Sequence, residues 1–365
     1  MNSRCLIVII SFNQLGYTKG CTESILKNTD YPYRILIVDN GSNKETVDYL
    51  KRIKEQNIAE VIFNKKNIGW VKAVNQGMYY SNSQYVCVMN NDTFVYPYWL
   101  PEMVAVAERD KSIGIVNPLW ELSKGFKGKI DNYYNKVIRS QRGQFIDTDW
   151  ARGFCFLVKR TVINKIGGLD EAFSPGYYDD WDYSVRAQES GFRCIRAKGA
   201  FVYHYKNITY SEELGQKGLD SILKEKGNVF YRRWGRPLRI LMVVDSIFKN
   251  TSVLLKDFIL YLLKKQNKVF ILSSQRDLCV NHTNCIVRKS KSAILRIKVF
   301  IKMLDNLRHS HSKRYDIILC SSPLNKFFKK FYFIRNNYIV KELDGNIDNR
   351  EELLSILSNL KKRGF

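Results

Sequence analysis

Two short polar stretches of this sequence follow buried apolar runs and carry side chains that can bind a ligand. Tyr85 to Met89 is apolar, and Asn90-Asn91-Asp92 then sets a carboxylate beside two amides. Asp39 ends a second run, and its oxygens can accept a hydrogen bond from the N3–H of a uracil or thymine base. The alternative interpretation is two plain turns, since Asn and Asp are ordinary turn residues.

A cluster of acids further along the chain can accept a proton. Asp179 and Asp180 are adjacent, and Asp182 follows two residues later. These like charges repel each other, which raises the pKa of one carboxyl and suits it to act as a base. For Asp182 the favoured interpretation is a helix cap before a helix over residues 183–189.

The elements that must position these residues alternate between strands and helices. Apolar runs predict buried strands over residues 5–10, 34–38, 60–63 and 85–89, and helices are expected over 15–27, 46–55 and 70–80. This alternation predicts a parallel sheet with right-handed crossovers. Ser11, Asn13, Asp39 and Asp92 then lie at one rim, where open α/β sheets bind nucleotides. The sequence has neither GxGxxG nor GxxxxGK[ST], which argues against dinucleotide and P-loop sites.

Composition limits the class of protein. With 365 residues and 45% hydrophobic residues, the chain is long enough for two domains or one large one. Its eight cysteines lie far apart, so we expect reduced thiols in a cytoplasmic protein. The apolar run at residues 5–10 is short for a signal peptide, and no run is long enough for a transmembrane helix. Of the net charge of +24, residues 236–365 contribute +16, from 26 Lys and Arg against 10 Asp and Glu. Such a surface either attracts phosphate-rich partners or is a solvated face.

Four motifs resemble those of the family 2 glycosyltransferases. They are SFNQ at 11–14, VDNGS at 38–42, NIGWVKAVNQG at 67–77 and MNNDT at 89–93, in the family's order. The resemblance covers roughly residues 4–205. It implies the GT-A fold, an α/β fold in which a nucleotide-binding sheet is joined to an acceptor-binding part.

The resemblance also implies roles for individual residues. The family's DxD metal motif reads Asn90-Asn91-Asp92 here, so Asp92 is the expected ligand of Mn²⁺ or Mg²⁺, with His204 completing the metal shell. With one carboxylate fewer, affinity for the ion alone should be weak. The remaining nucleotide-binding residues are expected to be Ser11, Asn13, Asp39, Asn67, Gly69, Asn90 and Asn91.

The acceptor side is implied by three further segments, ARGFCFLV at 151–158, IGGLDEAF at 166–173 and YYDDWDYSVR at 177–186. Asp180 is the expected base and Asp179 the residue that orients the acceptor or the loop. Gly153 and Trp181 are expected to contact the acceptor, Trp181 by stacking on a sugar; the alternative for Trp181 is a partly buried packing residue. We expect Arg186 and Arg193 to hold the acid cluster in place.

The implied activity is an inverting, metal-dependent transfer from a UDP- or dTDP-sugar to a glycan or lipid-linked acceptor in cell-surface polysaccharide synthesis. We expect the enzyme to be cytoplasmic, at the inner face of the membrane if it binds that surface. One alternative is a degenerate protein that binds nucleotide sugars without turnover, which Asn90 suggests. Another is a basic nucleic-acid-binding protein, but the sequence has no RNP, KH, zinc-finger or helix-turn-helix signature, so nucleic acid is not an expected partner.

The expected domains are 1–235, with a nucleotide half at about 1–95 and an acceptor half at about 96–235, and a smaller basic Rossmann-like domain at 236–365. Strands are expected there over 238–244, 268–274, 315–321 and 338–343, and helices over 251–265 and 292–307. This part resembles the start of a GT-B lobe, but it lacks the glycine-rich loop and the second lobe. The alternatives are an incomplete lobe left as a remnant, a scaffold, or the first part of a longer protein. The basic helix over 292–307 either packs on the core or contacts an anionic membrane.

Overall fold

The computed structural model describes residues 4–122, 126, 128–205, 208–244, 252–274, 278–291, 295, 298, 315–320, 339–342 and 349–362. Two compact units divide the chain, Met1–Phe230 and Tyr231–Phe365, and each is described by itself. Both units are α/β structures built on largely or wholly parallel sheets, which confirms the fold class predicted from the sequence. Within the described parts of the chain, every helix is too short or too polar to cross a bilayer.

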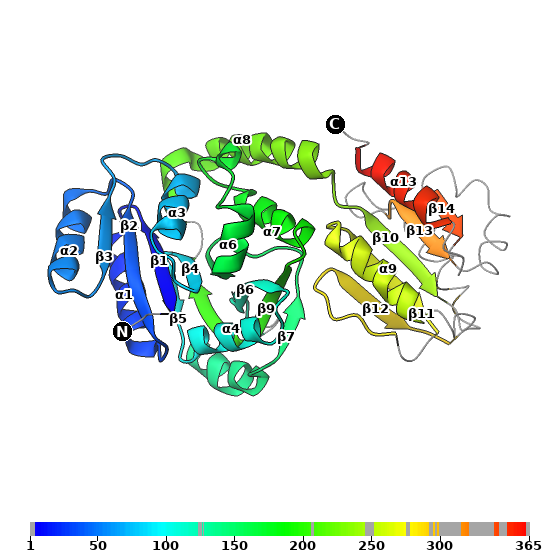
Figure 1. Cartoon of the computed structure of the whole chain (residues 1–365), viewed down its shortest axis with the longest axis horizontal. Helices are drawn as coiled ribbons and strands as arrows, with labels where there is room; N and C mark the ends of the chain where they lie inside the picture. Colours follow the sequence, from blue (N-terminus) through cyan, green and yellow to red (C-terminus); the bar gives the residue numbers. More distant parts are fainter. Residues whose placement is uncertain are drawn as a thin grey trace. The chain divides into compact units, whose positions relative to one another are not determined.

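The first unit opens with the predicted alternation of strands and helices. Its parallel strands lie in the order β3-β2-β1-β4, with α2 beside β3 at one end (Figure 1). Every residue of β1 is buried, which is why its run of apolar residues forms a central strand. The Asn43 side chain begins α2 by accepting a hydrogen bond from the Thr46 amide at 3.1 Å. The elements are β1 (Cys5–Ser11), α1 (Leu15–Asn28), β2 (Tyr33–Asp39), α2 (Lys44–Glu55), β3 (Glu60–Phe63), α3 (Trp70–Tyr79) and β4 (Tyr85–Asn90).

The strand register confirms that the polar residues share one rim of the sheet. Ser11 at the end of β1 pairs with Asp39 at the end of β2, and Ile10 pairs with Asn90 at the end of β4. All three strands run in the same direction, so their carboxyl ends, and the loops that follow them, gather at one edge.

The remaining strands of the first unit extend the sheet with mixed directions. β8 runs antiparallel between β4 and β6, and β9 is parallel to β6 but antiparallel to β5 and β7. The elements are β5 (Thr93–Val95), α4 (Trp99–Glu108), β6 (Ile113–Leu119), α5 (Ile130–Tyr133), η1 (Tyr134–Ile138), η2 (Arg139–Gln141), β7 (Phe145–Asp147), β8 (Cys155–Lys159), α6 (Arg160–Ile166), η3 (Glu171–Phe173), α7 (Asp179–Glu189), β9 (Arg193–His204) and α8 (Ile208–Trp234).

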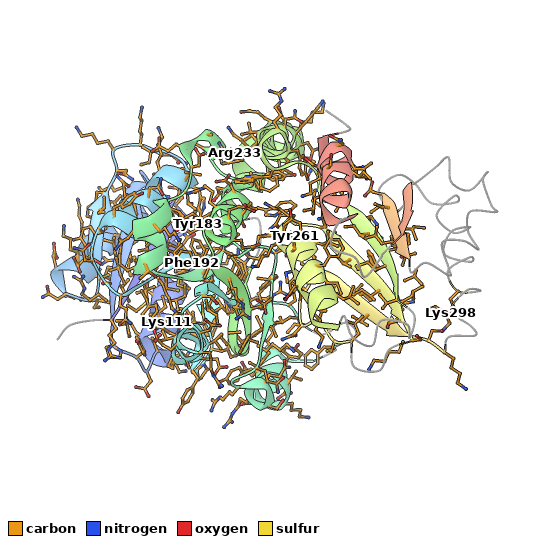
Figure 2. All side chains as sticks on the ribbon, turned by 45° about the vertical axis from the view of Figure 1, so that its right-hand side comes forward. Lys111, Tyr183, Phe192, Arg233, Tyr261 and Lys298 are labelled. Atoms are coloured by element: carbon orange, nitrogen blue, oxygen red, sulfur yellow. The ribbon has the colours of Figure 1, made fainter. Side chains whose placement is uncertain are left out.

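Helix α7 differs from the expectation at its start. It begins at Asp179, four residues before the predicted helix, so all three acids of the cluster lie in its first turn. Acids are favourable there because the helix dipole is positive at its N-terminus. Tyr183 anchors this helix in the interior of the unit (Figure 2), where its side chain is 1% exposed.

The second unit is a five-stranded parallel sheet in the order β12-β11-β10-β13-β14. Its elements are β10 (Arg239–Val244), α9 (Ser252–Lys264), β11 (Lys268–Ser273), β12 (Cys285–Lys289), β13 (Ile317–Cys320), β14 (Ile339–Glu342) and α13 (Asn349–Lys362). The four predicted strands are present, whereas β12 and α13 were not expected. The predicted basic helix over 292–307 lies outside the described residues, apart from Leu295 and Lys298.

Candidate functional site

A cleft of about 1110 Å³ opens at the rim where the first strands end. It gathers most of the residues singled out from the sequence: Asn67, Gly69, Asn90, Asn91, Asp92, Gly153, Asp179, Asp180, Trp181 and His204. These come from the ends of β4 and β9, the loop before α3, the loop before β8 and the start of α7. Segments more than a hundred residues apart in the sequence therefore form one concave site.

Asp92 and His204 face each other at one end of this cleft. Asp92 Oδ1 lies 3.1 Å from His204 Nε2, and the two side chains are 9% and 15% exposed. The pairing of β5 with β9 sets their positions, since Thr93 lies opposite His204 and the Tyr205 amide donates to the Asp92 carbonyl at 3.0 Å. Phe154 stacks on the imidazole, with the ring centroids 4.8 Å apart and the planes 16° apart.

The donor atoms at this end fit a divalent cation that is completed by a ligand. Asp92 Oδ1 is buried, and among the described residues it accepts no hydrogen bond of good geometry, although His204 Nε2 lies 3.1 Å away and a buried carboxylate oxygen normally has a partner. Asn90 adds an amide, 3.4 Å from His204 Nε2. Among the described residues no group of three His, Cys, Asp or Glu side chains converges on one point, so two protein ligands would leave positions for phosphate oxygens.

Ser11, Asn13 and Asp39 are not among the side chains that line the cleft. Asp39 is 1% exposed, and burial raises the pKa of its carboxyl, which accepts a hydrogen bond from the Ser42 amide at 3.4 Å. Asn13 accepts a hydrogen bond from the Asn43 amide at 2.8 Å, and Ser11 Oγ lies 3.2 Å from Thr18 Oγ1. These three residues hold the loops behind the cleft together in the structure as it stands.

Asn40 takes the cleft position next to Asp39, and it was missed in the sequence. Its amide group donates to Asn67 Oδ1 at 2.8 Å and accepts from the Ile68 backbone at 3.1 Å. Gly41 follows with φ of 83°, and a Cβ at that position would lie 2.6 Å from the Lys66 carbonyl carbon. The available signal was its place at the end of a buried strand, which is the same signal that drew attention to Asp39.

Asp179 and Asp180 differ in their surroundings, although they are neighbours in the chain. Asp179 is 4% exposed and accepts a hydrogen bond from the Trp70 indole at 3.1 Å. Burial, and then the charge of Asp180, raise the pKa of Asp179. Burial also raises the pKa of Asp180, but its carboxylate accepts backbone N–H groups from Gly153 and Trp181, each at 2.8 Å. Because these hydrogen bonds and the nearby charge of Arg152 favour the charged form, Asp180 is the member of the pair that ionises at lower pH and is then free to accept a proton.

Trp181 is a packing residue in the structure. Trp150 stacks on it with centroids 4.5 Å apart and planes 25° apart, and Phe230 lies 4.5 Å away. Tyr178 is also stacked with it, at 5.9 Å. Trp181 still lines the cleft, but stacking a sugar on its face would require these rings to move, so the alternative of a packed tryptophan fits better.

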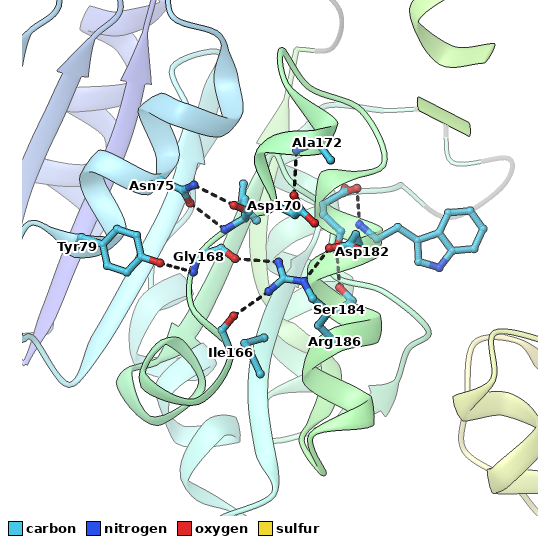
Figure 3. Close-up of polar contacts among 12 residues, drawn as sticks. Asn75, Tyr79, Ile166, Gly168, Asp170, Ala172, Asp182, Ser184 and Arg186 are labelled. Atoms are coloured by element: carbon cyan, nitrogen blue, oxygen red, sulfur yellow. Dashed lines mark hydrogen bonds and ion pairs between the residues drawn. The ribbon is translucent and has the colours of Figure 1, made fainter. Parts of the chain in front are cut away.

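The loop over residues 166–170 is held between two helices (Figure 3). On one side, Arg186 of α7 donates to Asp182 at 2.7 Å and to the carbonyls of Ile166 and Gly168 at 2.9 and 2.8 Å. Asp182 is therefore the ion-pair partner of Arg186. Arg193 lies elsewhere and pairs with Asp147 at 2.7 Å, so the expectation that it holds the acids is wrong.

On the other side of this loop, α3 supplies the contacts. The Gly168 amide donates to the Tyr79 hydroxyl at 2.6 Å, and the Asn75 side chain exchanges two hydrogen bonds with the Leu169 backbone, at 2.8 and 2.9 Å. A Cβ on Gly168 would lie 2.3 Å from Asn75 Oδ1, so this close approach requires glycine. The loop thereby connects α3, whose Trp70 reaches Asp179, to the helix that carries the acids.

Comparison with known proteins now identifies this part of the chain. Residues 6–167 match the model of the family described as Glycosyl transferase family 2. These residues form a family 2 glycosyltransferase domain. The O-antigen chain rhamnosyltransferase RfbN of Salmonella typhimurium is 24% identical over 220 residues, which are 57% of this chain and 68% of RfbN.

Other similar proteins match the chain over part of their length. Protein y4gI of Sinorhizobium fredii is 22% identical over 232 residues, 57% of this chain, but the chain spans only 25% of the length of y4gI. Among solved structures, mannosyltransferase PcManGT from Pyrobaculum calidifontis in complex with GDP-Man and Mn²⁺ has 16% identity and a TM-score of 0.47. That likeness covers 62% of this chain and 64% of PcManGT.

Proposed function

We propose that the protein is an inverting, metal-dependent glycosyltransferase that moves a sugar from a UDP- or dTDP-sugar to a hydroxyl of a glycan or lipid-linked acceptor. The observation that carries the proposal is one cleft that holds both Asp180 and the Asp92–His204 pair. The family of residues 6–167 supports sugar transfer. The similarity to RfbN, an O-antigen chain rhamnosyltransferase, supports a role in making cell-surface polysaccharide.

The chain's own residues supply two parts of this reaction. Asp180 removes the proton of the acceptor hydroxyl as that oxygen attacks the anomeric carbon, a contribution of about 10²–10⁴-fold in rate. Asp92 and His204 would hold a Mn²⁺ or Mg²⁺ ion, which would supply positive charge to stabilise the departing diphosphate. A single base with no enzyme nucleophile implies one displacement, and therefore inversion of configuration.

We propose that Asp39 recognises the donor base. Its carboxyl lies at the end of β2 and is nearly fully buried, and among the described residues its Oδ1 has no hydrogen-bond partner. A uracil or thymine N3–H is a donor that such an oxygen can accept once the loop behind the cleft moves to admit the base. This supports UDP- or dTDP-linked donors.

The test is turnover of a panel of UDP- and dTDP-sugars in the presence of Mn²⁺, followed by chromatography of the released nucleotide. We expect turnover in the unmodified protein and a loss of about 10²–10⁴-fold in Asp180→Asn, with UDP binding by calorimetry retained. Asp110→Asn, which changes an exposed acid outside the cleft, serves as the control and should keep full turnover.

A degenerate protein that only binds nucleotide sugars is the second candidate, because Asn90 stands where the family's metal motif has an acid. Metal-dependent UDP binding without turnover of any donor would support this candidate over the enzyme. Absence of UDP and dTDP binding would reject both.

A further inference from the structure

We propose that Arg152 determines acceptor specificity by binding an anionic group, a phosphate or a carboxylate, that the acceptor carries close to its attacking hydroxyl. The inference rests on the proposed function and names the class of acceptor for the same cleft. Arg152 lines that cleft, and it belongs to the loop before β8, next to Gly153, whose amide donates to Asp180 at 2.8 Å. Arg152 therefore belongs to the loop that contacts Asp180, the proposed base.

Arg152 is held by aromatic rings instead of by an acid. Its guanidinium carbon lies 3.9 Å from the centroid of the Trp150 ring and 5.7 Å from that of Trp120. Trp150 stacks in turn on Trp181, which packs on Phe230. The guanidinium therefore lies at one end of a row of packed aromatic rings, formed by Trp150, Trp181 and Phe230.

The N–H groups of the Arg152 guanidinium have no hydrogen-bond acceptor among the described residues. Among the described residues, no carboxylate forms an ion pair with it and no oxygen accepts a hydrogen bond from it, although it is only partly exposed. An arginine presents five N–H donors in a planar fork that matches phosphate and carboxylate oxygens. A second cation, Arg196, lies 4.2 Å from the Trp120 ring and adds positive potential behind it.

The backbone of this loop is fixed, so the cation is presented in one place. Asn117 accepts from the Arg152 amide at 2.9 Å and donates to the Arg152 carbonyl at 3.1 Å. The Ala151 amide donates to Ser184 Oγ at 2.9 Å, and Ser184 donates to the Asp180 carbonyl at 2.7 Å. Arg152 and the base are therefore parts of one hydrogen-bonded assembly, which can set the distance from an acceptor's anion to its reacting hydroxyl.

Charge arithmetic in the cleft favours the acceptor over the donor as the source of the anion. A divalent ion held by Asp92, just before β5, and His204, at the end of β9, would match the donor diphosphate. On the α7 side, the charge of Arg152 lowers the pKa of Asp180, but among the described residues no acid forms an ion pair with its guanidinium. In addition, Ile222 and Leu223 of α8 line the same cleft and offer apolar surface. An acceptor with an anionic group and an apolar portion would satisfy both features.

The experiment measures binding to protein saturated with UDP and Mn²⁺, with matched pairs of sugars as probes. The pairs are the 1-phosphates of glucose, galactose, N-acetylglucosamine and rhamnose against their methyl glycosides, and glucuronic and galacturonic acids against glucose and galactose. We expect the anionic member to bind about tenfold or more tightly in at least one set of pairs, the gain typical of hydrogen bonds to a charged group. Preference for 1-phosphates identifies a phosphoryl acceptor, and preference for uronates identifies an acidic sugar; either supports the proposal.

Three variants separate the role of Arg152 from general effects. Arg152→Gln should abolish the preference, and Arg152→Lys should keep part of it, since the charge stays but the fork is lost. Arg142→Gln is the matched control, because Arg142 also lies over an aromatic ring, 4.1 Å from the Tyr98 centroid, but is not among the residues that line the cleft. The preference of this variant for anionic probes should equal that of the unmodified protein. The Tm of each variant checks that it is folded.

Two results would overturn the inference while leaving the proposed function intact. The first is equal binding of charged and neutral probes by the unmodified protein, or a preference that survives in Arg152→Gln. The second is a tenfold loss of UDP affinity in Arg152→Gln, which would assign the arginine to the donor diphosphate. If the unmodified protein fails to bind UDP and dTDP at all, the proposed function itself fails and this inference falls with it.

Discussion

At the scale of single residues, the acid pair at the start of α7 makes the pH dependence of the reaction predictable. Asp179 and Asp180 both have pKa values raised by burial, and their charges oppose each other. A base works only when ionised, so kcat/KM should fall as pH drops through the raised pKa of Asp180, at a pH above about 3.9, the ordinary value for aspartate. A pH profile of donor turnover measures the midpoint.

Asp179→Asn tests the coupling directly. The charge of Asp180 raises the pKa of Asp179, so Asp179 is still neutral when Asp180 ionises, and the acid limb of the profile should stay at the same pH in this variant. The same variant should stabilise the fold at alkaline pH, because a carboxyl whose pKa is higher in the folded than in the unfolded protein destabilises the fold once it must ionise. Each tenfold difference between the two ionisation constants corresponds to about 1.4 kcal/mol. At pH values below the ordinary aspartate pKa the two proteins should unfold alike. An acid limb that moves to lower pH would mean that Asp179 is already charged when Asp180 titrates.

A second prediction at this scale concerns Asp92 at the proposed metal site. Asp92→Asn removes the one acid of the Asn90-Asn91-Asp92 motif, in which Asn90 already stands where the family has an acid. We expect Mn²⁺ to stop improving UDP affinity in this variant, a loss of about tenfold or more, because amide oxygens are weak ligands compared with carboxylates. Calorimetry with UDP alone is the control and should give the same affinity as the unmodified protein. A variant that keeps the full Mn²⁺ effect would place the ion elsewhere.

At the scale of elements, the loop over residues 166–170 depends on Arg186. Arg186→Met leaves Asp182, which is fully buried, without its ion-pair partner, and removes hydrogen bonds to two carbonyls. Loss of one partner from such a buried pair should lower the free energy of unfolding by about 3 kcal/mol. The double variant Asp182→Leu/Arg186→Met should lose less, because no charge remains unpaired.

Unfolding of these variants in guanidinium chloride should be compared with unfolding of a variant that breaks an exposed ion pair. Lys72→Met breaks the contact of Lys72 with Glu171, which spans 3.7 Å with both side chains about half exposed. Surface pairs of this kind contribute about 0–1 kcal/mol. If Arg186→Met unfolded at the same denaturant concentration as Lys72→Met, the contacts of Arg186 in Figure 3 would carry no net stability.

The same elements show what could be predicted from the sequence and why the rest could not. Uninterrupted apolar runs determined β1, β2 and β4, because a strand buried on both faces needs no alternation. Their parallel direction then placed Asp92 at the correct rim. By contrast, β12 (CIVRK) has two basic residues in five and lacks that signal.

The surroundings of several cleft residues depend on tertiary contacts that the sequence does not reveal. Trp181 looked equally suited to a sugar or to packing, and only the positions of Trp150 and Phe230 settled which rings cover it. Arg152 had no motif of its own, because its importance comes from an aromatic column contributed by distant segments. Asp182 was expected to cap a helix, and its partner Arg186 became apparent only once α7 was seen to begin at Asp179.

At the scale of the whole molecule, charge is distributed unevenly along the chain. Residues 236–365 carry +16 of the total of +24, which leaves +8 on the first 235 residues. Each basic residue near an anionic lipid surface is attracted by about 1 kcal/mol, so a few of them acting together suffice for binding. An enzyme that uses a lipid-linked acceptor would gain from such an attraction, because it raises the local concentration of the acceptor.

This distribution predicts that the protein binds vesicles containing phosphatidylglycerol and not vesicles of phosphatidylcholine alone. The interaction should be electrostatic, so it should hold at about 50 mM salt and be lost near 0.5 M, where screening acts within a few ångströms. Sedimentation with the two kinds of vesicle at both salt concentrations measures this. Binding that persists in high salt would indicate insertion of apolar side chains instead, and absence of binding in low salt would show that the basic residues form a solvated face.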